Sequence, residues 1–90
     1  MTLIVTRHRG LVHWLKEHGV EARVLAHATE EDVRDQDVYG VLPLGLAAAA
    51  RTVTTVDMPD LAPDQRGKDL MPSEMNAAGA RLRIFRVTEL

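Results

Sequence analysis

The chain of 90 residues contains no cysteine and very few aromatic residues. The absence of cysteine excludes a disulfide framework, a cysteine-based zinc site and a thiolate nucleophile, and it fits a reducing compartment. Aromatic residues make up only 3% of the sequence whereas 46% is hydrophobic, so the core must be built from Val, Leu, Ile and Ala. A chain of this length is expected to form one domain over residues 1–90, and its small core favours self-association.

The sequence also lacks a long apolar run and a strong excess of either charge. No segment is long and apolar enough to span a bilayer and the N-terminus shows no signal-peptide pattern, so we expect a cytoplasmic protein without a membrane partner. A formal net charge of −2 argues against a broad basic face that coats long nucleic acid. A small, local phosphate site is compatible with this charge.

Short apolar runs alternate with helical patterns along the chain. The first run, residues 3–5, is consecutive and mostly β-branched, which is typical of a strand covered on both faces. Trp14 lies on the apolar stripe of the helix that follows and is expected to anchor the core. Further strands are expected over residues 20–28, 38–42, 53–58 and 80–87, and helices over residues 11–18, 44–51 and 74–78. This order predicts an α/β fold with a mainly parallel sheet of about five strands.

Several residues are expected to set the ends of these elements. Gly19 is a plausible C-cap of the first helix, and Pro43 suits the first position of the second. Thr29 can cap a short helical turn in an acidic segment that we expect to be a surface connection. Ser73 can cap the last helix. Residues 60–73 form the longest irregular segment, and a loop of this length in so small a domain is typical of a lid or binding element.

Three polar residues, Thr6, Arg7 and His8, follow directly on the first strand. In open α/β sheets ligands bind where such strands end and helices begin. A hydroxyl and a guanidinium donate to phosphate oxygens, and an imidazole donates or moves a proton. The N-terminus of the following helix is expected to add free amide donors.

The parallel order places other strand ends at the same edge of the sheet. We expect His27, Pro43 and Leu44, and the segment after Asp57, to lie beside Thr6, Arg7 and His8 there. Gly45 presents backbone without a side chain, which would permit the close approach of a ligand.

Short motifs occur in a fixed order along nearly the whole chain: Thr6-Arg7-His8, Gly10, Trp14, Gly40-Val41-Leu42-Pro43, Pro59, Arg66-Gly67-Lys68-Asp69-Leu70, Met75, Gly79-Ala80-Arg81-Leu82 and Phe85. Together they resemble a family of small CRISPR-associated proteins that accompany type III CRISPR systems. Similar proteins are ring nucleases, which cut the second messenger cyclic tetra-adenylate and so switch off ancillary defence enzymes. The chain has Asp69 where the family has Glu.

The resemblance implies a small Rossmann-like, three-layer fold that acts as a homodimer without a metal or other cofactor. It implies that cyclic tetra-adenylate is cut to short linear adenylates. Thr6, Arg7 and His8 are then the candidate catalytic residues. The candidate substrate-binding residues are Gly10, Leu42, Pro43, Leu44, Gly45, Arg66 and Lys68, with Arg66 and Lys68 as phosphate contacts on the expected lid.

The residues themselves leave other functions open. The same Thr, Arg and backbone amides would serve a module that binds the ring or another nucleotide without cleaving it. An Arg-His pair after a strand is similar to the start of histidine phosphatases, but Arg9 intervenes before Gly10 and the chain is shorter than that fold requires. A protein that only builds an assembly is a third alternative. A metal site formed by His8, His27 and Asp57 lacks any recognisable ligand spacing.

Overall fold

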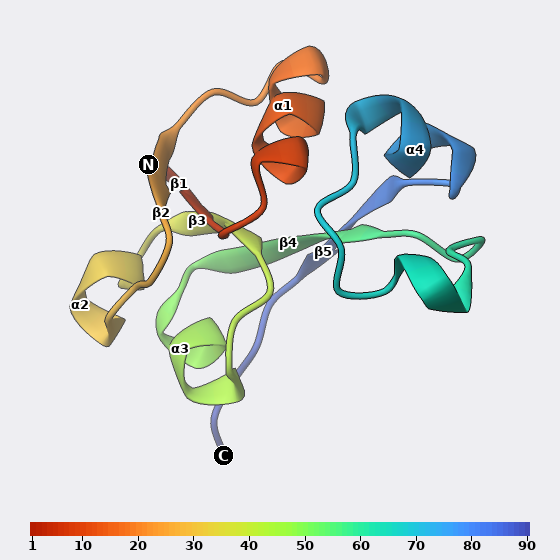
Figure 1. Cartoon of the computed structure of the whole chain (residues 1–90). Coiled ribbons are helices and arrows are strands. Elements are labelled where there is room, and N and C mark those ends of the chain that lie inside the picture. Colours follow the sequence, from red (N-terminus) through yellow and green to blue (C-terminus); the bar gives the residue numbers. More distant parts are fainter.

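The computed structural model describes residues 1–90 and is built around a five-stranded sheet with strand order β2-β1-β3-β4-β5. Strands β1 to β4 are parallel, and β5 pairs antiparallel with β4. The elements along the chain are β1 (Thr2–Val5), α1 (Arg9–Glu17), β2 (Arg23–Leu25), α2 (Glu30–Val33), β3 (Asp37–Gly40), α3 (Leu44–Ala49), β4 (Thr52–Asp57), the short 3-10 helix η1 (Pro63–Gln65), α4 (Pro72–Ala77) and β5 (Arg81–Phe85) (Figure 1). The expected α/β fold with a mainly parallel sheet is confirmed.

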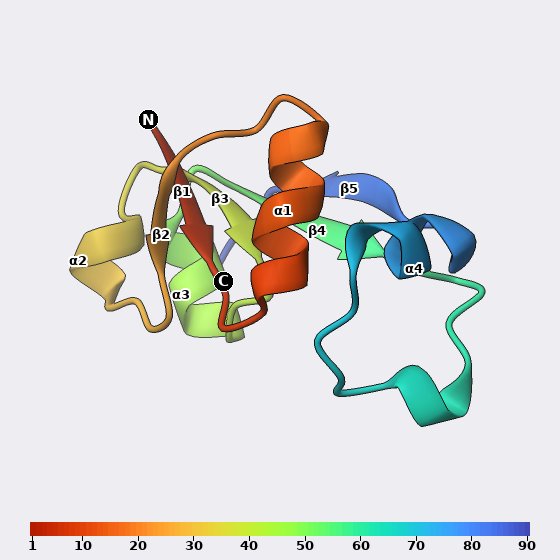
Figure 2. The same ribbon diagram turned by 45° about the horizontal axis from the view of Figure 1, so that its top comes forward.

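The sheet forms the middle of three layers. Helices α1 and α4 cover one face, and α2 and α3 cover the other (Figure 2). Successive side chains of β1 point to opposite faces, so Ile4 packs against Trp14 while Leu3 and Val5 face the second core. Trp14 is only 2% exposed, and its Nε1 donates to Asn76 Oδ1 of α4 at 2.8 Å. Its expected role as a core anchor is confirmed.

The largest difference from the expected elements is the strand predicted over residues 20–28. Only Arg23–Leu25 pairs with β1, because β2 is an edge strand whose neighbour is itself four residues long. Val24 is accordingly 43% exposed. The segment with alternating residue types is therefore longer than the part that pairs with β1.

The acidic segment after β2 is more than a surface connection. Thr29 caps α2 as expected: its Oγ1 accepts from the Asp32 amide at 3.3 Å, and the Asp32 carboxylate accepts from the Thr29 amide at 2.8 Å. This capping box lowers the pKa of Asp32, chiefly through the hydrogen bond from the Thr29 backbone. Val33 in the same turn is fully buried, so α2 contributes to the core.

Several element ends also differ from expectation. Helix α4 begins at Pro72, not after a Ser73 cap, because proline suits the first helical position and Glu74 accepts from the Met71 amide at 3.0 Å. Pro43 precedes α3 instead of opening it, and β3 stops at Gly40. The segment expected to be irregular over residues 60–73 contains η1. No helix of the structure is long and apolar enough to cross a membrane.

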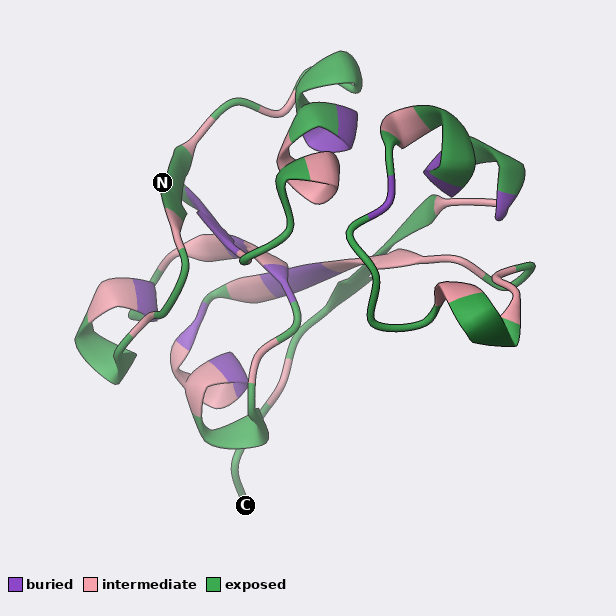
Figure 3. Cartoon of the chain, in the orientation of Figure 1, coloured by how far each residue is buried: buried purple, intermediate pink, exposed green.

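Strand β5 forms an exposed edge of the sheet. All five of its residues are exposed (Figure 3). Ile84 is 71% exposed. Arg81 and Arg83 lie 3.7 and 3.5 Å from the carboxylate of Asp57 on β4. These ion pairs connect the last strand to its only neighbour.

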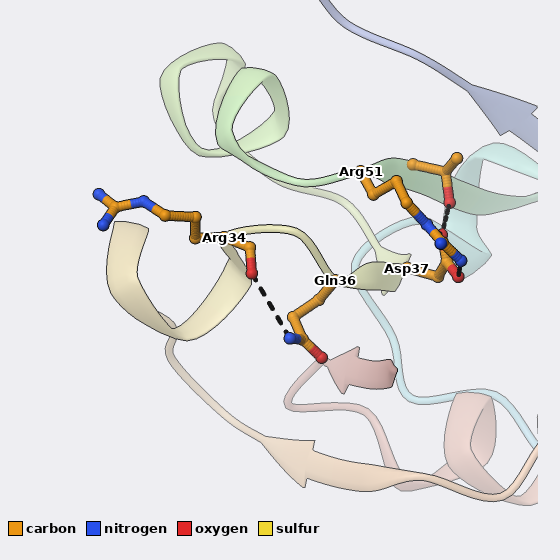
Figure 4. Close-up of polar contacts among 5 residues, drawn as sticks. Arg34, Gln36, Asp37 and Arg51 are labelled. Atoms are coloured by element: carbon orange, nitrogen blue, oxygen red, sulfur yellow. Dashed lines mark hydrogen bonds and ion pairs between the residues drawn. The ribbon is translucent and has the colours of Figure 1, made fainter.

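The amino-terminal ends of β3 and β4 are joined by a charged cluster. Arg51 Nε donates to Asp37 Oδ1 at 2.9 Å, and the guanidinium also pairs with the second carboxylate oxygen (Figure 4). Thr52 Oγ1 donates to Asp37 Oδ1 at 2.7 Å. The hydrogen bond from Arg51, followed by that from Thr52, holds the pKa of Asp37 well below its usual range, and the pKa of Arg51 is raised in return.

We predict that Asp37→Asn weakens the acid dependence of folding. A depressed pKa in the folded state stabilises the protein above the unfolded pKa of about 3.9, and this contribution is lost as the pH falls below that value. The free energy of unfolding, measured in urea between pH 7 and pH 3, should therefore fall less steeply for the variant than for the wild type. Glu89→Gln, which removes an exposed carboxyl of the C-terminal tail, is the control. Parallel curves for Asp37→Asn and wild type would contradict the prediction.

Candidate functional site

Thr6, Arg7 and His8 form the turn between β1 and α1, at the carboxyl edge of the sheet. The Thr6 amide donates to Leu25 O at 2.9 Å, which extends the β1–β2 pairing by one residue. Thr6 Oγ1 accepts from the His8 amide at 3.1 Å, so the side chain closes the turn. The hydroxyl hydrogen is not used in this bond and remains available to donate to a ligand.

Arg7 is held by a histidine from the neighbouring strand end. Its Nη2 lies 2.9 Å from His27 Nε2, and because a guanidinium has no acceptor, the imidazole nitrogen accepts. His27 lies two residues after β2 and is exposed, as is Arg7. The sequence predicted that His27 lies at this edge, but it did not predict the hydrogen bond from Arg7 to His27. The parallel topology was the available signal, since it brings the ends of β1 and β2 together.

The amino-terminal end of α1 does not offer the free donors that the sequence predicted. The Asp69 carboxylate accepts from the Arg9 amide at 3.3 Å and from the Gly10 amide at 3.0 Å. A carboxylate at this position satisfies otherwise unpaired helix amides and interacts favourably with the helix dipole. An anion at this edge must therefore rely on the side chains of Thr6, Arg7 and His8 more than on those two amides.

Two glycines are required by close backbone approaches near the site. A Cβ on Gly10 would lie 1.5 Å from the carbonyl oxygen of Leu70, so the space over this residue is filled by the chain itself. A Cβ on Gly40 would lie 2.2 Å from the carbonyl oxygen of Val5, at the point where β1 and β3 end side by side. The lack of a side chain at Gly10 thus allows the segment with Asp69 and Leu70 to approach α1. The lack of a side chain at Gly40 allows the end of β1 to approach β3.

Two hollows open at this edge. We call the first the edge hollow; it has a volume of about 330 Å³ and is lined by Val5, Thr6, Arg7, His8, Leu11, Ala26 and Val41. We call the second the apolar cavity; it has a volume of about 210 Å³ and is lined by His8, Leu11, Gly40, Val41, Val56, Met58, Leu61, Gln65, Gly67, Lys68, Asp69, Leu70 and Met75. The two hollows share three lining residues: His8, Leu11 and Val41.

The remaining predicted site residues divide between this edge and other parts of the surface. Lys68 lines the apolar cavity beside His8. Leu44 and Gly45 instead line a hollow beside the C-terminal tail. Pro43 and Arg66 are exposed and line neither hollow, and Leu42 packs against the core on the α2 and α3 side of the sheet. The structure therefore brings Thr6, Arg7, His8 and Lys68 to adjoining hollows but does not bring Leu44 or Gly45 there.

The charged and polar groups at the edge are suited to an anion more than to a cation. No group of three or more His, Asp or Glu side chains is arranged to hold a metal ion. Asp69, an acidic residue close to the edge hollow, is bonded to the amides of α1. The donors of the turn belong to Arg7 and His8, which are exposed, and to Thr6, which is half-buried.

The fold and this edge define a small Rossmann-like α/β protein with a candidate anion site at the carboxyl ends of parallel strands. Residues 3–88 match the family model described as "Putative CRISPR-associated protein (Cas_VVA1548)". The chain belongs to this family of CRISPR-associated proteins. No match was found among curated proteins or among solved structures.

We predict opposite effects for two glycine-to-alanine substitutions. Gly10→Ala should lower the free energy of unfolding by about 1–3 kcal/mol, because its Cβ would overlap a backbone carbonyl that cannot move aside cheaply. Gly45→Ala is the matched control: it lies in α3 with open space around the added carbon, and it should raise stability by roughly 0.5–1 kcal/mol. Urea unfolding of the three proteins measures both effects. Equal stability of Gly10→Ala and wild type would show that the Leu70 carbonyl does not approach this closely.

Proposed function

We propose that this CRISPR-associated protein is a ring nuclease that cleaves cyclic tetra-adenylate, the second messenger of type III CRISPR immunity. The observation that carries the proposal is the grouping of a hydroxyl, a guanidinium and an imidazole in one turn at the carboxyl edge of the sheet, in a chain whose family is CRISPR-associated. Thr6, Arg7 and His8 match the motif of the ring nucleases that the sequence resembles. Cleavage would switch off the enzymes that the messenger activates.

In this reaction the protein needs to position the 2′-hydroxyl in line with the phosphate and to stabilise the negative charge that develops there. A ribose 2′-hydroxyl attacks the adjacent phosphorus, the bond from phosphorus to the 5′-oxygen breaks, and the 2′-hydroxyl proton is released as the 5′-oxygen gains one. The products are linear adenylates that end in a 2′,3′-cyclic phosphate. Because the nucleophile already sits beside its phosphate, in-line geometry and stabilisation of the developing charge supply most of the acceleration. No metal is required for this route.

Each residue of the turn has a distinct role in this proposal. The Arg7 guanidinium binds the phosphate oxygens, and its bond with His27 holds it at the edge. The Thr6 hydroxyl donates to a phosphate oxygen or contacts the 2′-hydroxyl. His8 protonates the 5′-oxygen or donates a hydrogen bond to it. Lys68 supplies a further positive charge at the adjoining cavity.

We further propose that two copies of the chain act together on one ring. A cyclic tetranucleotide has a rotational symmetry that a two-fold protein dimer can match, with each subunit presenting the same strand-end edge. Val41, which lines both hollows at this edge, is a large apolar residue that is 83% exposed in the isolated chain. Contact with a second copy or with the ring would remove the Val41 side chain from water.

The direct test is to incubate the purified protein with radiolabelled cyclic tetra-adenylate in excess EDTA and to separate the products over time. We expect conversion to linear adenylates that carry a 2′,3′-cyclic phosphate. An intact ring that is nevertheless bound saturably would assign the chain to the binding modules. Cleavage only after Mg²⁺ or Mn²⁺ is restored would reject the metal-independent route.

Arg7→Ala is expected to reduce the cleavage rate about a hundredfold, the loss typical when one donor to a developing oxyanion is removed. Arg34→Ala is the matched control, since it removes an exposed arginine of the α2 C-cap that pairs only with Glu30. Single-turnover rates of both variants, measured with protein in excess over the ring, compare them directly. Wild-type rates for both Arg7→Ala and His8→Ala would place the site elsewhere.

A further inference from the structure

We propose that the apolar cavity is a nucleobase pocket that holds one adenine of the ring while its phosphate lies in the edge hollow. The identity of the base rests on the proposed function. The pocket itself rests on its lining, its size and its position, which are independent of whether the chain cleaves anything.

The lining of the apolar cavity is suited to a flat, largely apolar group. Its walls are aliphatic and thioether side chains from α1, the end of β4, the following segment and α4, among them Leu11, Val56, Met58, Leu61 and Met75. Its volume of about 210 Å³ is well above the roughly 10–15 Å³ that one water molecule needs. Ordered water has few polar partners on such walls, whereas a bicyclic base would fill the space and bury its faces.

The position of the cavity matches the shape of a nucleotide. A nucleotide carries its phosphate and its base on opposite sides of one ribose. Here the edge hollow, with Thr6 and Arg7, adjoins the apolar cavity, and both contact His8, Leu11 and Val41. A ribose over His8 would therefore place its phosphate near Arg7 and its base between Leu61 and Met58.

Gln65 supplies a polar group that can recognise the edge of the base. Its Oε1 accepts from the Ala62 amide at 3.1 Å, which holds the side chain in place at the cavity. The Nε2 group is left to donate, and the ring nitrogens of adenine accept. Asp69 also lines the cavity, but its carboxylate is bonded to the amides of α1.

None of the three aromatic residues of the chain lines either hollow; they are Trp14, Tyr39 and Phe85. Trp14 is buried, bonded to Asn76 and stacked on His18 at 3.8 Å between ring centroids. Phe85 lies on β5 under the Arg83 guanidinium, at 5.1 Å from its ring centroid. Tyr39 on β3 is half-buried and packs against the core that contains Trp14. Proteins that hold single-stranded nucleotides commonly stack bases on aromatic rings, so burial in an apolar cavity takes that role here.

The four methionines provide a built-in test. Met58 and Met75 line the apolar cavity, whereas Met1 and Met71 do not. In the full chain labelled with ¹³C at the methionine methyl groups, adenosine 5′-monophosphate should shift the Met58 and Met75 signals through the ring current of the base and leave the other two unchanged. Ribose 5-phosphate, which lacks the base, should shift neither cavity methionine.

The outcomes separate this inference from the proposed function. Selective shifts of Met58 and Met75 in a protein that does not cleave cyclic tetra-adenylate would support the pocket and reject the nuclease. Cleavage of the ring without any shift of these two signals, either with adenosine 5′-monophosphate or with the ring bound to Arg7→Ala, would keep the nuclease and overturn the pocket. Uniform shifts of all four methionines, or no shift with no cleavage, would overturn the pocket as well.

A substitution that fills the cavity tests the same inference through kinetics. Leu61→Trp should raise the KM for cyclic tetra-adenylate about tenfold, the order expected when one apolar pocket contact of a substrate is lost. Met71→Trp adds the same ring at a side chain that is 65% exposed and outside the cavity, and its KM should match that of the wild type. An unchanged KM for a folded Leu61→Trp protein would overturn the pocket.

Discussion

The carboxylate of Asp69 on the first amides of α1 is the contact on which the candidate site depends. It joins positions separated by 59 and 60 residues in the chain and occupies the donors that a helix end otherwise leaves unpaired. The absence of a side chain at Gly10 allows the neighbouring Leu70 carbonyl to approach α1. Together these contacts hold the segment after β4 against the turn that carries Thr6, Arg7 and His8. That segment lines the apolar cavity, which shares His8, Leu11 and Val41 with the edge hollow.

The two ends of the parallel strands are stabilised in different ways. At the amino-terminal ends of β3 and β4, Asp37 is saturated by Arg51 and Thr52, so the charges there neutralise one another. At the carboxyl ends, the exposed Arg7 guanidinium is paired only with the His27 imidazole. The sheet thus separates an end that contributes stability from an end with uncompensated positive charge. The carboxyl end is also where open α/β sheets bind their ligands.

The sequence predicted those parts of the fold that depend on local pattern. The buried run of β1, the Trp14 anchor and the Thr29 cap all follow from residue types and spacing within a few positions. The predicted length of β2 was wrong because the partner strand sets how many residues can pair. Alternation of residue types within the segment does not set that number. The predicted start of α4 was wrong because Pro72 occupies the first helical position, so the helix begins before Ser73.

The candidate site was only partly predictable from the sequence. Thr6, Arg7 and His8 are adjacent in sequence, and the end of a predicted strand identifies them as a group. The capping of α1 by Asp69 and the pairing of Arg7 with His27 are long-range contacts that no local pattern encodes. The apolar cavity depends in the same way on residues from five elements, and only the packed chain shows that Lys68 and Gln65 reach it.

Strand β5 has a consequence for how copies of the chain can meet. An exposed edge strand with apolar residues such as Ile84 is a template on which another strand can add. An antiparallel pair of β5 strands centred on Arg83 would set two guanidinium groups opposite each other, and one centred on Leu82 would set Arg81 opposite Arg83. The positive charges therefore discourage continuation of the sheet from one molecule to the next. They leave the chain free to associate through other surfaces without growing into a fibre.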